Sequence, residues 1–113
     1  MVKDIFLNKG NVYYAKLHNN HKGIQGGSRP VIVMGIYGSV VSIIPLTTKL
    51  KRLDLRQHVQ IKTIDKKGCK HDSNCLLEQL TTIPKEDIID YYGYILQEDK
   101  EKINDRIKEV INI

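Results

Sequence analysis

Residues 25–46 read QGGSRPVIVMGIYGSVVSIIPL, and this segment carries the strongest structural signal in the chain. It contains two apolar segments, Val31–Ile36 and Val40–Leu46. Only Tyr37-Gly38-Ser39 separates them, which is short enough for a tight turn. The segment therefore predicts two buried antiparallel strands that form the central hairpin of the protein.

The residues that precede this hairpin, Gln25–Pro30, are expected to form a loop that presents a cation. Gly26 and Gly27 permit backbone conformations that are closed to other residues, and Pro30 favours an extended conformation of Arg29. The loop would then hold one guanidinium at the rim of a buried strand. Such a position suits the binding of an anion, for example a phosphate.

Further strands are predicted outward from the hairpin, at residues 12–17, 58–61, 74–80 and 91–96. Residues 82–89 carry the polar residue, proline and early acids that are typical of the start of a short helix. Residues 49–56 are expected to form a helical turn or an irregular excursion. Residues 98–111 place apolar side chains at helical spacing, namely Ile103, Ile107, Val110 and Ile111. The predicted fold class is mostly β with α, a small, mainly antiparallel barrel with a C-terminal amphipathic helix.

Length and charge restrict the function. The chain has 113 residues and no visible repeat or linker, so we expect a single domain over residues 1–113. Its formal net charge of +5 and its isoelectric point near 9.2 favour a polyanionic partner such as nucleic acid, although many basic domains have no such partner.

The cysteine content and the apolar segments indicate a cytoplasmic protein. No leader-like apolar segment follows Met1, and no apolar run approaches the length of a membrane span, so no membrane partner is expected. Cys69 and Cys75 are expected to be reduced. Together with His71 they would still lack a fourth zinc ligand, so the sequence predicts neither a metal site nor a cofactor.

The order of several motifs resembles that of the MazF/PemK family of toxin endoribonucleases. The matching segments are residues 10–17, 25–33, 45–49, 58–61 and 72–83. The resemblance covers the chain from Gly10 to about Leu96. The specificity of the match lies in their order and spacing rather than in any one motif.

This resemblance implies a small SH3-like barrel of the PemK/CcdB type, usually a homodimer. It implies the toxin of a type II toxin-antitoxin system, which is inhibited by a cognate antitoxin whose tail lies in the RNA groove. The implied activity is metal-independent, sequence-selective cleavage of single-stranded mRNA. The ribose 2′-hydroxyl attacks the neighbouring phosphorus, leaving a 2′,3′-cyclic phosphate and a 5′-hydroxyl.

Two residues match the catalytic residues of the family, Arg29 its arginine and Thr47 its threonine. Because arginine is effectively always protonated, Arg29 is interpreted as an electrostatic clamp on the phosphorane. Thr47 would donate a hydrogen bond to the same phosphate. Thr48 should point to the opposite face if the strand continues through it. Without the resemblance, a surface salt bridge and an ordinary strand-end residue would be the simpler interpretations.

The residues expected to bind RNA lie in three segments. They are Gln25, Gly26, Gly27, Ser28, Thr48, Lys49, Lys51, Arg52, Arg56, Glu78 and Gln79. The basic residues after Thr47 would line a phosphate groove, or form a solvated face. In the predicted late strand, Gln79 would bond a base edge and Glu78 would orient Arg29 or accept a proton, unless both are ordinary strand-end residues facing water.

The chain also departs from the family. Leu76 and Thr81 stand where relatives often carry arginine. Their presence favours a simpler MazF-like site in which Arg29 carries more of the charge stabilisation. Two other functions stay open at this point. One is a non-catalytic binding module on the same barrel, such as a CcdB-like poison of DNA gyrase, since folds do not fix functions. The other is an inactive relative kept for partner binding.

Overall fold

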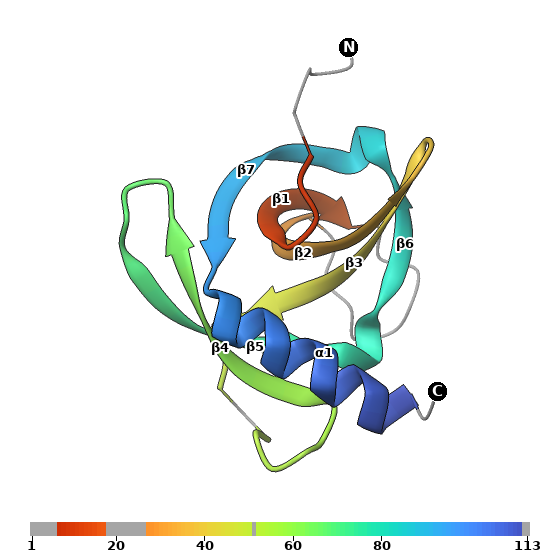
Figure 1. Ribbon diagram of the computed structural model, residues 1–113. Coiled ribbons are helices and arrows are strands. Elements are labelled where there is room, and N and C mark those ends of the chain that lie inside the picture. The colour runs from red at the N-terminus through yellow and green to blue at the C-terminus, as the bar shows by residue number, and fades with distance from the viewer. Residues whose placement is uncertain (1–6, 18–26, 51, 112–113) are drawn as a thin grey trace.

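The structure is a computed structural model that describes residues 7–17, 27–50 and 52–111 (Figure 1). In these ranges the strands are β1 (Asn11–Leu17), β2 (Gly27–Tyr37), β3 (Val40–Thr47), β4 (His58–Asp65), β5 (Lys70–Leu76), β6 (Thr81–Pro84) and β7 (Ile88–Ile95). Two short 3₁₀ helices, η1 (Leu77–Gln79) and η2 (Lys85–Asp87), lie on either side of β6. Helix α1 (Gln97–Ile111) completes the described chain.

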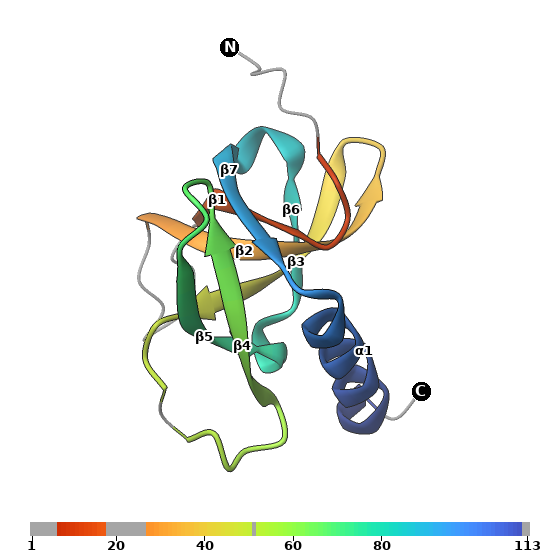
Figure 2. The same cartoon turned by 60° about the vertical axis from the view of Figure 1, so that its left-hand side comes forward.

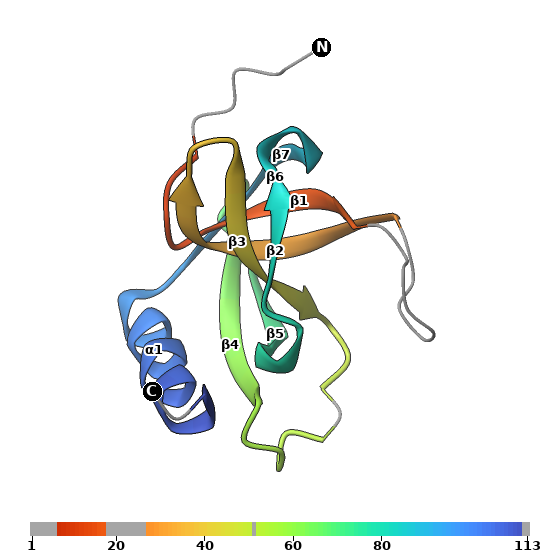
Figure 3. The same ribbon diagram turned by 90° about the vertical axis from the view of Figure 1, so that its right-hand side faces the viewer.

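The strands form one antiparallel sheet of seven, in the order β2-β1-β7-β4-β5-β3-β6, and β2 also pairs with β3. Because β2 stands at one end of that order, its pairing with β3 closes the sheet on itself. Figures 2 and 3 show β1, β2 and β3 crossing β4 and β5 at a steep angle. The predicted mostly β, mainly antiparallel barrel with a C-terminal helix is confirmed.

The predicted central hairpin of β2 and β3 is also confirmed, with Gly38 and Ser39 as its turn. Alternate residues of β2 enter two different cores. Ile32 belongs to one core, whereas Val31 and Val33 belong to the other. Both faces of this strand are therefore buried, which explains why its sequence is a continuous apolar run rather than an alternation.

We call these two cores the helix-side core and the hairpin-side core. The helix-side core contains Val12, Ile32, Ile44, Leu46, Val59, Ile61, Cys75, Leu77, Ile95 and Ile103. The hairpin-side core contains Tyr13, Ala15, Leu17, Val31, Val33, Val41, Ile43, Ile83 and Ile88. Burial of this apolar surface is the main favourable term in folding.

Helix α1 lies across β4 and closes the helix-side core (Figure 1). Ile103 is only 1% exposed, and Ile107 packs against the same core, as the helical spacing predicted. Polar contacts add to this apolar face. The backbone N–H of Lys62 donates to the buried carboxylate of Asp99 (3.0 Å), and Lys102 donates to the Gln60 carbonyl (2.9 Å).

The predicted bounds of two elements after β4 are wrong. The strand expected at residues 74–80 is β5, which begins at Lys70 and ends at Leu76. The chain then turns as η1 because the side chain of Leu77 enters the helix-side core. The short helix expected at residues 82–89 is limited to the single turn η2, and strand β6 precedes it.

The loop expected before Val31 is also shorter than predicted. Gly27–Pro30 already belongs to β2, where Ser28 pairs with Lys16 and Arg29 pairs with Ala15 of β1. Gly27 has φ +103°, a conformation that favours glycine, at the first residue of the strand. Residues 52–56 form irregular turns, which agrees with one of the two expectations for that segment.

Candidate functional site

Arg29 and Thr47 lie at the same end of the central hairpin. In the β2–β3 register Val31 pairs with Pro45, so two further residues along each strand lead to Arg29 and Thr47. Both side chains line one cavity of about 360 Å³. The two residues predicted to be catalytic are thus brought together by a hairpin that the apolar sequence itself specifies.

The cavity is lined by residues of six strands, β1 to β5 and β7, and by the residue after β3. Besides Arg29 and Thr47 it is lined by Tyr14, Pro30, Leu46, Thr48, Thr63, Ser73 and Tyr92. Hydroxyl groups dominate this lining, and no carboxylate is among these residues. The cavity therefore combines one fixed positive charge with many hydrogen-bonding groups that are neutral at physiological pH.

Arg29 is only partly exposed, and its guanidinium forms no ion pair with any carboxylate in the described ranges. The other arginines of these ranges differ in this respect. Arg52 pairs with Asp54, Arg56 pairs with Glu109, and Arg106 lies 3.9 Å from Glu109. The charge of Arg29 is consequently available to an anion in the cavity.

Thr47 is oriented by its own backbone neighbourhood. Its Oγ1 accepts a hydrogen bond from the backbone N–H of Lys49 (3.2 Å), which leaves the hydroxyl hydrogen free to be donated. Strand β3 ends at Thr47, so the alternation of faces does not continue through Thr48. Thr48 therefore lines the same cavity rather than pointing to the opposite face.

The basic segment after Thr47 stands apart from the cavity. Arg52, Arg56 and Lys49 are exposed, and none of them lines the cavity. The guanidinium of Arg52 hydrogen-bonds the carboxylate of Asp54 and holds the pKa of that carboxyl below its ordinary value. Gly27 and Ser28 are exposed at the start of β2. Gln25, Gly26 and Lys51, also expected to bind RNA, lie outside the described residues.

Glu78 and Gln79 belong to η1 rather than to a strand end. The carboxylate of Glu78 lies 3.1 Å from Nε2 of His58, so the structure shows it orienting this histidine and not Arg29. The other ring nitrogen of His58 is 3.1 Å from the Arg52 carbonyl oxygen. Gln79 is partly exposed and lies outside the cavity lining.

Neither cysteine is part of the cavity lining. Both are free thiols, Cys69 exposed and Cys75 buried. Burial, and to a lesser extent the charge of Glu78, raises the pKa of the Cys75 thiol to about 12. No group of three or more His, Cys, Asp or Glu residues in the described part of the chain is placed to hold a metal ion.

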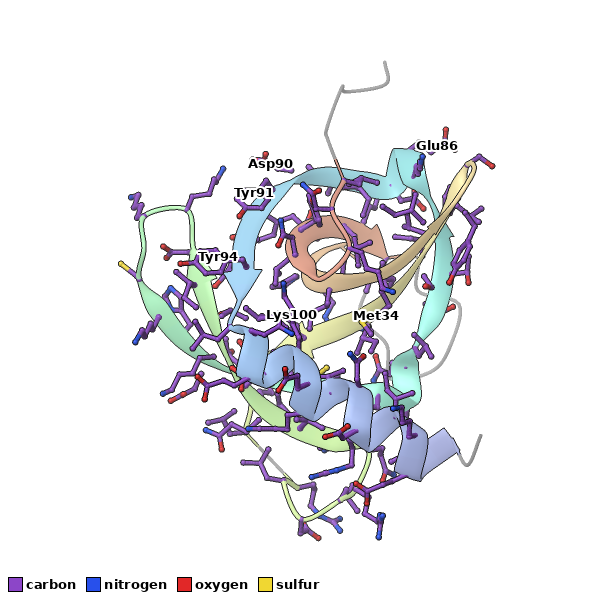
Figure 4. All side chains as sticks on the ribbon, viewed as in Figure 1. Met34, Glu86, Asp90, Tyr91, Tyr94 and Lys100 are labelled. Atoms are coloured by element: carbon purple, nitrogen blue, oxygen red, sulfur yellow. The ribbon has the colours of Figure 1, made fainter. Side chains whose placement is uncertain are left out.

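A second, smaller cavity of about 170 Å³ contains none of the predicted site residues. Its lining includes Met34 of β2 and Lys100 of α1, which are visible in Figure 4.

Among residues 7–17, 27–50 and 52–111, no helix combines the length and apolar content needed to cross a membrane.

Comparison with known proteins decides the family. The model of the PemK-like, MazF-like toxins of type II toxin-antitoxin systems matches residues 8–111. The chain belongs to this family. Endoribonuclease EndoA of Bacillus subtilis, a curated relative, is 28% identical over 109 residues, which cover 92% of this chain and 93% of EndoA.

Solved structures of a MazF protein and of an endoribonuclease share the fold. MazF from Deinococcus radiodurans superposes with a TM-score of 0.74 at 11% identity, covering 97% of this chain and 100% of its own. An endoribonuclease from a mycobacterial species, solved in complex with its cognate antitoxin, gives a TM-score of 0.70 at 18% identity and covers 93% of this chain and 94% of its own. At these identities the likeness establishes the PemK/MazF fold.

Six residues that line this cavity of the PemK/MazF chain were not predicted as site residues. They are Tyr14, Pro30, Leu46, Thr63, Ser73 and Tyr92. Thr63 and Ser73 occur in strands whose polar residues read as a solvent face, yet they are 1% and 5% exposed. A sequence signal for Tyr92 is the neighbouring Gly93, which marks a bulge or a close backbone approach within a strand.

Proposed function

We propose that this chain is the toxin of a type II toxin-antitoxin system and that it cleaves single-stranded mRNA at the cavity containing Arg29 and Thr47. One observation carries the proposal: the two residues that match the family's catalytic pair line a single cavity, and the arginine has no ion-pair partner in the described part of the chain. The relationship to EndoA over nearly the whole of both chains supports the same activity.

The proposed reaction is an internal transesterification. The RNA 2′-hydroxyl loses its proton and its oxygen forms a bond to the adjacent phosphorus. The bond from phosphorus to the 5′-oxygen then breaks, and that oxygen gains a proton. The products are a 2′,3′-cyclic phosphate and a 5′-hydroxyl. Because the nucleophile belongs to the RNA itself, the protein's main task is to stabilise charge on the phosphorane.

Arg29 and Thr47 divide this task. The guanidinium of Arg29 supplies a permanent positive charge and several donors in a rigid fork. The Oγ1 of Thr47 accepts a hydrogen bond from the backbone N–H of Lys49, so its own hydroxyl hydrogen can be donated to a phosphate oxygen. Both contacts strengthen as negative charge grows on the phosphate, so they accelerate the reaction rather than only binding the substrate. The scheme needs no metal because this positive charge is supplied by the side chain.

Incubation with a long single-stranded RNA in the presence of a chelator tests the proposal. We expect fragments with cyclic-phosphate and 5′-hydroxyl ends. Loss of one such stabilising donor typically lowers the rate by about 10² to 10³, so Arg29→Ala and Thr47→Val should each do so. Thr82→Val removes a hydroxyl from the exposed strand β6 and should leave the rate unchanged. Intact RNA with a correctly folded parent protein would contradict the proposal.

The partners follow from the same assignment. The mycobacterial relative was solved with its cognate antitoxin, and we propose that a cognate antitoxin also inhibits this chain. We further propose that residues 1–113 form one toxin domain, that the protein acts in the cytoplasm as a homodimer, and that cleavage is sequence-selective.

No observation favours the alternative function, a CcdB-like gyrase poison. Growth arrest that is lost with Arg29→Ala would support the ribonuclease over that alternative.

A further inference from the structure

We propose that Tyr92, Thr63 and Ser73 form a pocket that selects the base of a nucleotide flanking the scissile phosphate, an inference that rests on the proposed function. These residues line the same cavity as Arg29 and Thr47. The cavity therefore offers a site for a phosphate and, beside it, a group of hydroxyls and an aromatic ring. A nucleotide presents the matching groups, an anion and a flat ring with a polar edge.

The direction of the Tyr92 side chain arises from an irregularity in β7. Val12 pairs with Gly93 and Tyr13 pairs with Tyr91, which leaves Tyr92 as the extra residue of a β-bulge. Bulges change the direction of a side chain and are over-represented beside active sites. Here the bulge accompanies a Tyr92 side chain that reaches the cavity, where its hydroxyl lies 3.3 Å from Oγ1 of Thr63.

The hydroxyls are buried but only loosely bonded to one another. Thr63 and Ser73 are almost fully buried, and their oxygens are 3.4 Å apart. Thr63 Oγ1 is also 3.4 Å from the His71 carbonyl. All these distances exceed the usual 2.7–2.8 Å of a hydroxyl hydrogen bond, and Thr63 has one hydrogen for three neighbours. The group consequently retains donors and acceptors that a base edge in the cavity can use.

Two tyrosine rings complete the pocket. The rings of Tyr14 and Tyr92 meet edge to face, with centroids 5.3 Å apart and planes at 70°. Tyr14 is 36% exposed, so part of its surface is open to solvent. Proteins that bind single-stranded RNA stack unpaired bases on such rings and read their edges with polar groups. The stacking would hold any base, whereas the hydroxyls would distinguish one base from another.

Substitutions that remove only the hydroxyls test the pocket. Tyr92→Phe and Thr63→Val keep the shape of each side chain, and both proteins are compared with the parent on an RNA pool with random sequence, with the cut ends sequenced. We expect the preference at one nucleotide beside the cut to fall roughly five- to tenfold, the size of one or more lost hydrogen bonds. Preferences at the other positions should persist.

The matched control is Tyr94→Phe, which removes a hydroxyl from the same strand. Tyr94 lies on β7 (Figure 4), is 44% exposed and does not line the cavity. We expect its cut-site preferences to equal those of the parent. Unchanged preferences in both Tyr92→Phe and Thr63→Val, with cleavage intact, would overturn the pocket while leaving the proposed ribonuclease activity in place.

A binding measurement separates the two proposals if the parent protein does not cleave. Fluorescently labelled decanucleotides of A, C, G and U are titrated with the parent, Tyr92→Phe and Tyr94→Phe. In that case the missing cleavage contradicts the ribonuclease, whereas a preference for one base that is lost in Tyr92→Phe but kept in Tyr94→Phe supports the pocket. Equal affinity of the parent for all four oligonucleotides contradicts the pocket.

Discussion

Gly93 of β7 lies so close to Ile64 of β4 that a Cβ atom on residue 93 would be only 1.8 Å from the Ile64 carbonyl oxygen. This contact sets the distance between two neighbouring strands of the closed sheet. It also lies next to Tyr92, whose hydroxyl meets Thr63 of β4. The glycine is therefore a structural requirement of the cavity as well as of the sheet.

Gly93→Ala should destabilise the protein by roughly 1–3 kcal/mol, because backbone atoms on both strands would have to move. Urea unfolding followed by circular dichroism measures the change. Gly35→Ala is the control. There the added Cβ would be 2.3 Å from the hydroxyl of the Tyr37 side chain, which is 63% exposed and can rotate away. Equal destabilisation by the two substitutions would show that the Ile64 contact is not the cause.

Helix α1 holds the irregular segment before β4 through Arg106. Its guanidinium donates to the carbonyl oxygens of Arg56 (3.0 Å) and His58 (3.4 Å). Arg106→Ala should raise hydrogen exchange of the amides of residues 52–57 by about tenfold, since a hydrogen bond from a charged donor contributes about 1.5–3 kcal/mol. Lys108→Ala, on the same helix, is the control and should leave exchange unchanged. Protection that persists in Arg106→Ala would mean that His58 and Glu78 hold the segment without the helix.

RNA binding by the basic segment should depend on which cations are already paired. Arg56 forms an ion pair with Glu109, whereas Lys49 follows Thr47 directly and is exposed. Each lysine or arginine bound to a single-stranded phosphate contributes about 0.7 to the slope of log affinity against log salt. Lys49→Gln should reduce the slope by about that amount, and Arg56→Gln by less. Affinity titrations between 50 and 200 mM salt, a range chosen to resolve that slope, compare the two variants, and a larger effect of Arg56→Gln would refute this ranking.

Asp65 should stabilise the β4–β5 hairpin at neutral pH and lose that effect in acid. Its carboxylate bonds the His71 ring (2.8 Å) and the backbone N–H groups of Cys69 and Lys67, and these bonds lower its pKa below the ordinary 3.8. A lowered folded-state pKa contributes stability that is present above the unfolded-state pKa and disappears as the pH falls through the folded-state value. The loss therefore falls below about pH 4.

Urea unfolding of Asp65→Asn checks this dependence. The variant should be less stable than the parent at pH 7, and the difference should shrink at pH 3. Asp72→Asn removes an exposed carboxylate, paired with Lys62, from the same hairpin and should change stability little at pH 7. A difference for Asp65→Asn that is the same at both pH values would contradict the assignment.

The sequence predicted those parts of the fold in which local apolar pattern and tertiary packing agree. The β2–β3 hairpin is apolar on both faces, and α1 buries its helical stripe through Ile103, so each could be found from spacing alone. The beginning of strand β5 could not be predicted, because it consists of the polar residues Lys70, His71 and Asp72, which acquire their extended form from pairing with β4. Tertiary pairing here overrides local preference.

The candidate site also contains residues that the sequence could predict and residues that it could not. Arg29 and Thr47 could be proposed because they match the catalytic residues of the family that the sequence resembles. Gly93 marks an irregularity beside Tyr92, but the direction of the Tyr92 side chain could not be predicted, because it depends on a bulge in the pairing of β1 with β7. A register shift of one residue depends on two strands that are far apart in the sequence.

The two parts of the cavity consequently differ in how they can diverge among related proteins. The reacting pair belongs to one continuous segment of 21 residues, from Gly27 to Thr47, which forms the β2–β3 hairpin. The proposed pocket of Tyr92, Thr63 and Ser73 is assembled from β7, β4 and β5, which join the hairpin only when the sheet closes. Changes in those distant strands can give a descendant new target sequences while its bond-breaking chemistry is inherited intact.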